Sequence, residues 1–260
     1  MKICFFGENL SDIKRKEYLK CIKDNNDRYD ELLPDVVFVF GGDGTFLKAV
    51  NHYLDIINKV NFVPLRKDNS LGFFYEFKES DFAFVYKLLK ANRLNKHSFP
   101  LLKGSFDDKS NIFAVNEIRI ECPFSTFKSK VFIDNTLLEM YRGNGLNISS
   151  SLGSSAYNKS LGGALIDSSL SLLQLSEIAP INNSLFRCIN SPLVISKESN
   201  IKIELLEPSK VIVGYDQNII ENKIFKSIVI SLEENKSINI LFSNKYSYIK
   251  NIRRGFIKNE

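Results

Sequence analysis

The chain has 260 residues, which corresponds to one large domain or two small ones. A hydrophobic fraction of 44% and a charged fraction of 25% are those of a globular protein and exclude a largely disordered one. Thirty-five basic and thirty acidic side chains leave a net charge of +5 that is dispersed along the chain. This mild excess suits anionic small ligands but does not indicate nucleic-acid binding. No apolar stretch reaches the roughly 18–20 residues that span a bilayer, and the start lacks a signal-peptide layout, so we expect a cytoplasmic protein without membrane partners.

The sequence contains few of the cysteine and histidine residues that metal sites and hydrolase active sites commonly use. The chain has four cysteines, Cys4, Cys21, Cys122 and Cys188. They are far apart and form no C-x-x-C pair, which argues against a disulfide framework or a zinc site. Only two histidines are present, His52 and His97, so a Ser-His-Asp triad or a multi-histidine metal site is not expected. We therefore predict no metal ligands from the protein.

Strand-like and helix-like patterns alternate over the first 97 residues. The β-prone segments are 2–6, 36–40 and 61–65, and the helical segments are 12–24 (with Ser11 as its cap), 45–58 and 81–90. The run VVFVF at 36–40 is apolar throughout, as in a strand buried on both faces of a parallel sheet. This alternation predicts an α/β domain over residues 1–97.

From about residue 98 to residue 242 the pattern changes to short β-prone runs at fairly regular intervals. These runs are IFAVNEIRIE, KVFIDN, GLNIS, SPLVIS, IKIELL, KVIVGYD, IVISLE and INILF. One helical interruption is expected near 155–165. The pattern favours a β-rich, β-sandwich-like domain over further βαβ units.

The segment Gly41-Gly42-Asp43-Gly44-Thr45 lies directly between a predicted strand and a predicted helix. Its glycines allow a ligand to approach the backbone closely, and the N–H groups at a helix start attract phosphate. It matches neither a Walker A loop nor a G-x-G-x-x-G fingerprint. A carboxylate here repels phosphate unless it binds a metal, a ribose hydroxyl or a proton in transfer. The alternative is a tight turn in which Asp43 caps the helix.

Three further segments combine polar and small residues. Asn116-Glu117 follows a β-prone stretch and by itself indicates only an exposed polar pair. Residues 141–167, YRGNGLNISSSLGSSAYNKSLGGALID, offer hydroxyl donors for phosphate or ribose oxygens, and Tyr157 is placed to border a base. A Ser-rich surface loop is the alternative there. Gly214-Tyr215-Asp216-Gln217 indicates a plain turn after a strand.

Taken together, the motifs resemble the NAD kinases in their compact bacterial form. They are GGDGTFLKA at 41–49, NE at 116–117, RGNGLNISSSLGSSAYNKSLGGALI at 142–166, QLSEIAPINN at 174–183 and DQ at 216–217, in the family's order and near its spacing. GGDGT alone is less specific, because diacylglycerol kinases, sphingosine kinases and phosphofructokinases carry related loops. The segment GSSAYNKSLGGAL distinguishes the NAD kinases from these.

The resemblance implies transfer of the terminal phosphate of ATP, or of polyphosphate in some members, to the adenosine-ribose 2′-hydroxyl of NAD. It also implies a magnesium ion held mainly by the nucleotide phosphates. The implied fold is an α/β domain of residues 1–97, to which 243–260 returns, and a β-rich domain of residues 98–242. A homodimer or homotetramer is implied, with the NAD site completed by a neighbouring subunit. The alternatives are a lipid kinase of the diacylglycerol or sphingosine kinase type and a catalytically silent nucleotide-binding regulatory protein.

By motif match, Asp43 is the expected general base, Gly44 its NAD-contacting neighbour and Lys48 a basic residue that faces NAD or phosphate. The remaining expected contacts are Asn116, Glu117, Arg142, Asn144, Ser155, Ala156, Tyr157, Asn158, Lys159, Ser160, Ala179 and Gln217. The pair at 116–117 is expected to hold the dinucleotide, and 155–160 to wrap the adenosine. Arg142 and Asn144 match positions around the nicotinamide end.

The sequence departs from the family at two places. Asn144 stands where the family usually has aspartate. The segment Ser150-Ser151-Leu152-Gly153-Ser154-Ser155 stands where the family usually reads Thr-Pro-Thr-Gly-Ser-Thr. These differences bear on affinity and on the choice of phosphate donor more than on the reaction.

Overall fold

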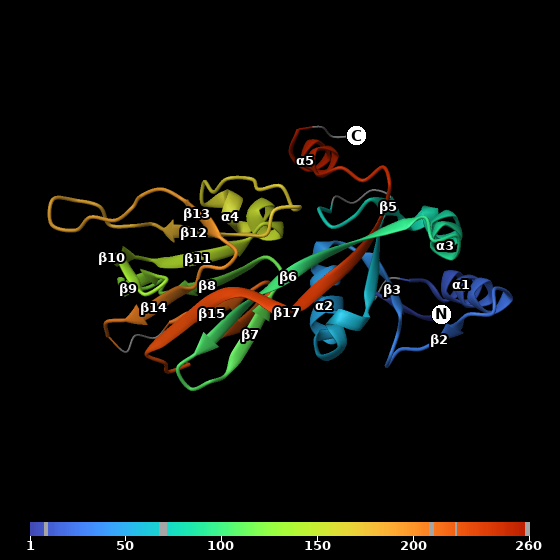
Figure 1. Cartoon of the computed structure of the whole chain (residues 1–260), viewed down its shortest axis with the longest axis horizontal. Helices are drawn as coiled ribbons and strands as arrows, with labels where there is room; N and C mark the ends of the chain where they lie inside the picture. Colours follow the sequence, from blue (N-terminus) through green and yellow to red (C-terminus); the bar gives the residue numbers. More distant parts are fainter. Residues whose placement is uncertain (8–9, 68–71, 208–210, 222, 258–260) are drawn as a thin grey trace. The chain divides into compact units, whose positions relative to one another are not determined.

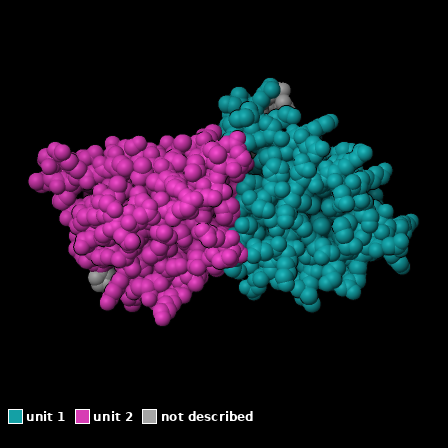
Figure 2. Space-filling view, in the orientation of Figure 1, with its two compact units in different colours: residues 1–99, 236–260 teal, residues 100–235 magenta. Residues whose placement is uncertain are grey.

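The computed structural model describes residues 1–7, 10–67, 72–207, 211–221 and 223–257 (Figure 1). The chain forms two compact units, shown in different colours in Figure 2. Unit 1 consists of Met1–Phe99 and Lys236–Glu260, and unit 2 of Pro100–Asn235. The chain leaves unit 1 within strand β6 (Leu94–Phe106) and returns within strand β17 (Ser227–Ser243). The domain limits expected from the sequence stay a prediction, and the last three residues of the expected return segment 243–260 lie outside the described residues.

Unit 1 is a parallel sheet with helices on both faces. Its strands are β1 (Lys2–Phe6), β2 (Arg28–Tyr29), β3 (Val36–Gly41), β4 (Asn61–Arg66), β5 (Phe77–Lys78) and the part of β17 from residue 236 onward. Their order is β17-β4-β3-β1-β2, with β5 paired to β4. The helices are α1 (Asp12–Asp24), α2 (Asp43–His52), η1 (Leu54–Lys59), η2 (Glu79–Asp81), α3 (Phe82–Lys90) and α5 (Tyr248–Phe256). The predicted α/β pattern of this part of the chain is confirmed.

The two faces of this sheet are packed by different helices. On one face, the rings of Tyr18 of α1 and Phe82 of α3 stack 3.8 Å apart, and Phe82 also contacts Phe38 of β3. On the other face, Phe46 of α2 packs edge-on against Phe62 of β4 at 5.7 Å. Because side chains of a strand alternate between the faces, a strand covered on both sides needs apolar residues at every position. The run VVFVF meets this requirement, and it ends at the turn that carries Asp43.

Unit 2 contains two antiparallel arrangements of strands. The six-stranded sheet has the order β13-β12-β11-β8-β15-β16. Its strands are β8 (Glu117–Glu121), β11 (Gly145–Ser150), β12 (Leu172–Ile178), β13 (Leu193–Ser196), β15 (Ile212–Tyr215) and β16 (Asn218–Ile220). The second sheet has the order β10-β9-β14-β17, with β6 paired to β17 and to β7. Its further strands are β7 (Asn111–Ala114), β9 (Phe127–Ile133), β10 (Thr136–Gly143) and β14 (Ile201–Leu205).

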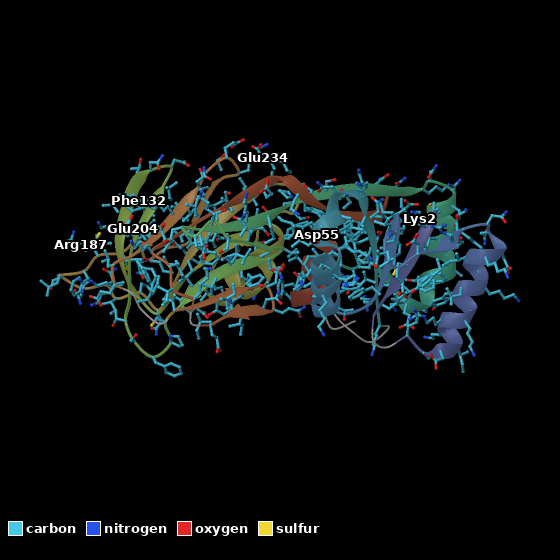
Figure 3. The ribbon with its side chains drawn as sticks, turned by 90° about the horizontal axis from the view of Figure 1, so that it is seen from below. Lys2, Asp55, Phe132, Arg187, Glu204 and Glu234 are labelled. Carbon is cyan, nitrogen blue, oxygen red and sulfur yellow. The ribbon has the colours of Figure 1, made fainter. Side chains whose placement is uncertain are left out.

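One apolar core lies between the two sheets of unit 2. Phe127 and Val131 of β9 are fully buried in it, together with Ile118 of β8 and Ile148 of β11. Phe132 and Glu204, labelled in Figure 3, point away from this core on the neighbouring strands β9 and β14. Two sheets that share a core are the arrangement of a β-sandwich. The predicted fold class, an α/β N-terminal domain plus a β-sandwich-like C-terminal domain, is confirmed.

The structure differs from the sequence prediction at several elements. Strands β6, β10 and β12 were not predicted, and the predicted strands IVISLE and INILF form the single strand β17. Buried apolar and exposed charged residues are the usual pattern of a strand, and β10 inverts it: Glu139 is buried, and Met140 is 46% exposed. The helix predicted over 45–58 ends at His52 and is followed by the 3₁₀ segment η1. The interruption expected near 155–165 is present as η3 (Leu152–Ser155) and α4 (Tyr157–Ser160).

The buried Glu139 of β10 forms a carboxyl pair with Glu177 of β12. One oxygen of each accepts a backbone N–H from the loop before β13, Ile189 at 3.1 Å and Asn190 at 2.7 Å. The Oε1 atoms of both are buried and have no hydrogen-bond partner among the described residues. Burial and the charge of Glu177 raise the pKa of Glu139 from its ordinary 4.5 to about 7. The pair therefore holds a proton near neutral pH. The loop before β13, which donates the N–H groups of Ile189 and Asn190, also contains Arg187, labelled in Figure 3.

We predict that Glu139→Gln stabilises the protein at high pH. The folded protein holds this proton more tightly than the unfolded chain, so the pair's contribution is fully present below about pH 4.5 and is lost as pH rises through about 7. A glutamine is neutral at every pH, so the variant should exceed the wild type by about 1–3 kcal/mol in unfolding free energy at pH 8 and match it at pH 5. Urea unfolding at both pH values measures this, with the exposed Glu207→Gln as control. An identical pH dependence in wild type and variant would contradict the shared proton.

Candidate active site

Asp43 is the first residue of α2, and the backbone of a distant segment in the same unit holds its carboxylate. Oδ1 accepts the N–H groups of Phe73 at 3.0 Å and Phe74 at 3.3 Å, and Oδ2 accepts that of Phe73 at 3.1 Å. The N-cap of α2 is Gly42, and the Asp43 side chain turns away from its own helix. The alternative in which Asp43 only caps the helix therefore does not hold.

The segment that holds Asp43, residues 72–75, packs tightly against the turn before α2. The hydroxyl of the fully buried Tyr75 donates a hydrogen bond of 2.7 Å to the carbonyl of Gly42. A Cβ at Gly72 would lie 2.6 Å from the Tyr75 ring and 3.2 Å from Oδ1 of Asp43. Glycine is therefore required for this approach. Sequence analysis missed the 72–75 segment, which carries no charged residue and resembles an ordinary apolar run.

The hydrogen bonds leave one position on the Asp43 carboxylate for a substrate proton. Each carboxylate oxygen offers two lone-pair sites; Oδ1 receives two donors and Oδ2 only one. Burial raises the pKa of Asp43, and the N–H groups of Phe73 and Phe74 and the charge of Arg254 oppose this rise. A fixed carboxylate with an open acceptor site and a raised pKa suits a general base.

Gly44 and Lys48 are exposed on α2. Lys48 lies on the same helix face as Thr45 and His52, and all three line a cavity of 340 Å³ together with Cys4 and Arg15. Glu31 also lines this cavity and forms an ion pair of 3.1 Å with Arg15, so Lys48 is the basic residue there whose charge suits an anionic group. The structure thus places Lys48 at a cavity that Thr45 of the glycine-rich segment also lines, and its contact with NAD or phosphate stays a prediction.

In unit 2, Asn116 and Glu117 lie beside the turn that contains Gln217. Oδ1 of Asp216 accepts the N–H of Asn116 at 2.7 Å, and Oδ2 accepts that of Val115 at 2.9 Å. In return the N–H of Asp216 donates to the carbonyl of Glu117 at 3.1 Å. The structure therefore brings three predicted site residues together through Asp216, which sequence analysis treated as part of a plain turn.

Two atoms of this pair have unused hydrogen-bonding capacity. Oδ1 of Asn116 and Oε2 of Glu117 are buried, and neither has a partner within the described ranges. Burial and the charge of Asp216 raise the pKa of Glu117 to about 7, and burial raises that of Asp216 to about 6. Buried polar atoms in folded proteins are almost always satisfied by protein, water or ligand. These atoms are therefore positioned to bind a ligand or an ordered water.

The Ser-rich segment is anchored directly onto Asn116. A Cβ at Gly153 would overlap the carbonyl oxygen of Asn116, so only glycine allows η3 to lie on the start of β8. The hydroxyl of Ser150 donates to the carbonyl of Val115 at 2.6 Å and accepts the N–H of Gly153 at 3.1 Å. The sequence motif thus encodes a close contact between the 150–155 turn and the Asn116-Glu117 pair.

Of the predicted stretch 155–160, Asn158 is fully buried and serves the protein itself. Its Oδ1 accepts a hydrogen bond of 2.8 Å from the hydroxyl of Ser176. Tyr157 is half-buried, with the guanidinium of Arg119 4.7 Å from its ring centre and its hydroxyl 3.4 Å from Glu121. The rest of the stretch is half-buried or exposed: Ser155, Ala156, Lys159 and Ser160. Contact of this stretch with an adenosine stays a prediction.

Arg142, Asn144 and Ala179 meet at the end of β12. The guanidinium of Arg142 lies 3.8 Å from the ring centre of Phe186. The N–H of Asn144 donates to the carbonyl of Ile178 at 2.9 Å. Ala179 is exposed and has a φ of +46°, in the left-handed region that alanine rarely adopts. Strained backbone without a packing reason often marks a functional site.

Two further polar residues of β11 belong to the segment 141–167: Ser149, one of its expected hydroxyl donors, and Asn147, which was not predicted as a site residue. Asn147 and Ser149 are fully buried on the face opposite the apolar core. Both amide atoms of Asn147 and the hydroxyl of Ser149 have no hydrogen-bond partner in the described part of the chain. Ser149 is paired in register with Glu117. The available sequence signal was their alternation with the apolar Leu146 and Ile148 in a strand expected to be buried.

We predict that the backbone strain at Ala179 lowers the stability of the protein. Ala179→Gly should raise the unfolding free energy by about 0.5–1 kcal/mol, because glycine adopts positive φ without the steric penalty. Ala164→Gly is the matched control: Ala164 is also exposed but has no positive φ, so this variant should lose about 0.5–1 kcal/mol through the freer unfolded chain. Chemical denaturation measures both, and equal losses in the two variants would contradict the strain.

Comparison with known proteins identifies the family. Residues 116–242 match the family described as the ATP-NAD kinase C-terminal domain. The chain is 31% identical to the NAD kinase of Leuconostoc citreum over 263 residues, which cover 99% of this chain and 98% of the relative. It is 38% identical to the NAD kinase of Levilactobacillus brevis over 207 residues, which cover 77% of this chain and 76% of the relative.

Solved structures show the same fold. Yeast NADH kinase complexed with NADH gives a TM-score of 0.80 at 18% identity, covering 100% of this chain and 89% of that one. The NAD kinase of Archaeoglobus fulgidus in complex with ATP gives a TM-score of 0.71 at 20% identity, covering 96% of each chain. The similarity in sequence to the Leuconostoc citreum relative extends over nearly the full length of both chains. The chain therefore belongs to the NAD kinase family.

Proposed function

We propose that this NAD kinase transfers the terminal phosphate of ATP to the adenosine-ribose 2′-hydroxyl of NAD, with Asp43 as the general base. The observation that carries the role of Asp43 is its carboxylate, fixed by the N–H groups of Phe73 and Phe74 with one acceptor position left open. The relatives named NAD kinase support NAD as the acceptor, and the similar archaeal structure in complex with ATP supports ATP as the donor. Polyphosphate is the alternative donor.

In this mechanism the protein's main contributions are positioning and one proton acceptor. Oδ2 of Asp43 accepts the proton of the 2′-hydroxyl while the hydroxyl oxygen forms a bond to the terminal phosphorus of ATP. The bond between that phosphorus and the bridging oxygen breaks, and ADP leaves. Lys48 is proposed to face a phosphate group from the cavity beside the turn.

Magnesium fits this site as an ion carried by the nucleotide. The described residues hold no group of three His, Cys, Asp or Glu side chains arranged for a metal ion. The oxygens of Asp43 already accept backbone N–H groups, which suits a base more than a ligand of a dedicated metal site. Bound to the phosphates of ATP, magnesium neutralises their charge.

We propose that the residues that match the family's motifs contact NAD. They are Asp43, Gly44, Lys48, Asn116, Glu117, Arg142, Asn144, Ser155, Ala156, Tyr157, Asn158, Lys159, Ser160, Ala179 and Gln217. The unused Oδ1 of Asn116 and Oε2 of Glu117 support this assignment, because a dinucleotide offers hydroxyl and amide donors for them.

A homo-oligomer, as a dimer or tetramer, is also proposed. The edge strand β10 exposes Leu137 by 49% and Met140 by 46%, and Leu185 in the loop after β12 is 82% exposed. Exposed apolar residues on an unpaired strand edge are typical of surfaces that a further chain covers. The expected cytoplasmic location stays a prediction.

The alternative functions are not supported. The relatives are named NAD kinases, and none of those compared is a lipid kinase. Among the described residues, no helix has the length and apolarity needed to cross a bilayer. A catalytically silent protein remains distinguishable by assay, since it would bind NAD without forming NADP.

We expect Asp43→Asn to abolish turnover while NAD binding changes by no more than a few-fold. The asparagine oxygen still accepts a backbone N–H, but the amide takes up no proton, and loss of a general base lowers the rate by about 10²–10⁴. NADP formation from NAD, ATP and magnesium measures turnover, and Asp55→Asn, exposed in the same unit and labelled in Figure 3, is the control. Near-normal kcat in Asp43→Asn would disprove the role as base. No NADP from the wild type would disprove the function.

The departure at Asn144 gives a prediction about redox form. An aspartate beside the nicotinamide would attract the positive charge of the oxidised ring, and Asn144 lacks that charge. Charge-assisted hydrogen bonds are about twice as strong as neutral ones, which amounts to about 1 kcal/mol in a partly wet site. We expect weak discrimination between NAD and NADH, and a few-fold shift towards NAD in Asn144→Asp. The measurement is kcat/KM for both substrates at one salt concentration. An unchanged ratio would place residue 144 away from the nicotinamide.

A further inference from the structure

The segment that holds Asp43 is itself held by the C-terminal helix α5. Nη2 of Arg254 donates to the carbonyls of Gly72 at 2.7 Å and Tyr75 at 2.5 Å, and Nδ2 of Asn251 donates to the carbonyl of Phe73 at 3.1 Å. Figure 1 shows α5 near the chain segment that leads into β5. Residues 72–75 belong to this segment. These contacts lie within unit 1 and join residues that are 178 to 182 positions apart.

Two of these contacts act on the same peptide groups that bind Asp43. The carbonyl of Gly72 and the N–H of Phe73 form one planar peptide group, and so do the carbonyl of Phe73 and the N–H of Phe74. Arg254 therefore binds the oxygen of the first group, and Asn251 that of the second, while Asp43 accepts both hydrogens. Fixing the oxygen of a rigid plane fixes the direction of its N–H, and linked hydrogen bonds strengthen one another.

The arrangement of α5 supports this function. Asn251 is 5% exposed and Arg254, three positions later, is half-buried on the same helix face, whereas Arg253 is exposed. The ring of Phe256 packs 4.8 Å from that of Phe73 and places the helix against the segment. Nε of Arg254 is buried and has no hydrogen-bond partner among the residues that the structure describes. The half-buried guanidinium of Arg254 therefore makes its described hydrogen bonds through Nη2, to the carbonyls of Gly72 and Tyr75.

We propose that Arg254 and Asn251 are positioning residues for the general base: through the two peptide groups at 72–74 they fix the orientation of the Asp43 carboxylate. The inference rests on the proposed role of Asp43. Asn251 and Arg254 of the C-terminal helix then act on catalysis through the 72–74 segment.

The two residues act differently on the protonation of Asp43. The guanidinium of Arg254 lowers the pKa of Asp43, against the burial that raises it, and Asn251 carries no charge. The other charged or titratable groups that face Arg254 are Arg66, Glu76 and Tyr246, and Tyr75 faces Asp43. Loss of Arg254 therefore raises the pKa of Asp43 further, while loss of Asn251 acts on this pKa only by loosening the N–H of Phe74.

The test compares Arg254→Gln, Arg254→Lys and Asn251→Ala with the exposed neighbour variant Arg253→Gln. For Arg254→Gln we expect kcat to fall at least tenfold and the acid limb of its pH profile to move up by about 0.5–1 unit. Lysine keeps the positive charge but lacks the planar guanidinium that binds the two carbonyls. In Arg254→Lys the acid limb should therefore lie at its wild-type position, while kcat recovers only in part compared with Arg254→Gln. For Asn251→Ala we expect a lower kcat and a smaller upward shift of the limb than in Arg254→Gln. Arg253→Gln should behave as the wild type.

Hydrogen exchange of the Phe73 and Phe74 amides, measured without substrate, gives a readout that does not depend on activity. Both amides should exchange faster in Arg254→Gln, and Phe74 in Asn251→Ala. Wild-type exchange in both variants, or faster exchange with unchanged kcat and limb, would overturn the proposal. If Arg254→Gln does not fold, Arg254→Lys and Asn251→Ala decide the question. Absence of NADP formation in every protein, including the wild type, would reject the proposed function, and exchange would still show whether α5 holds the segment.

Discussion

The hydrogen bonds from the N–H groups of Phe73 and Phe74 to Asp43 are the constraint on which the catalytic end of unit 1 depends. They bind a residue at the start of α2 to a segment thirty positions later in the chain. The parallel sheet brings these parts close, because β3 ends at the turn before Asp43 and its neighbour β4 leads towards the 72–75 segment. Helix α5 then holds that segment from the outside. A base that must be fixed in direction is thus built from three parts of the chain that are distant in sequence.

Unit 2 follows a different principle, in which the protein leaves polar atoms unsatisfied. Asn116, Glu117, Asn147 and Ser149 contribute buried polar atoms that have no partner among the described residues. Each such atom costs about 1–3 kcal/mol if it stays unsatisfied. They lie close together on the polar side of the six-stranded sheet, whose other side packs into the apolar core. Grouped in this way, the atoms are available to a polar ligand, which agrees with NAD as the substrate.

The sequence predicted the α/β and β-rich parts because helices and parallel strands leave clear apolar patterns, as VVFVF does. It missed β10, where Glu139 is buried and Met140 exposed, because buried carboxyl groups and exposed apolar residues invert the pattern. The predicted site residues came from motifs, and motifs describe residues near one another in sequence. Phe73, Phe74, Asn251 and Arg254 were missed for that reason. The hydrogen bonds that link these four residues and Asp43 involve backbone groups of the 72–75 segment, which leave no mark in the sequence. The composition of the 72–75 segment and of α5 resembles that of ordinary core and surface segments.

The structure also resolves the contradiction of a carboxylate within a turn that attracts phosphate. Asp43 occupies the first position of α2, where the helix dipole favours a negative charge, and two backbone N–H groups share that charge. The N–H groups, the dipole and Arg254 favour the ionised form of the carboxylate, while burial raises its pKa above that of a surface aspartate. With its charge partly compensated by these groups, the carboxylate repels an approaching phosphate less than a free one would. Burial thus supplies the basicity of Asp43, while the N–H groups, the helix dipole and Arg254 supply its tolerance of phosphate.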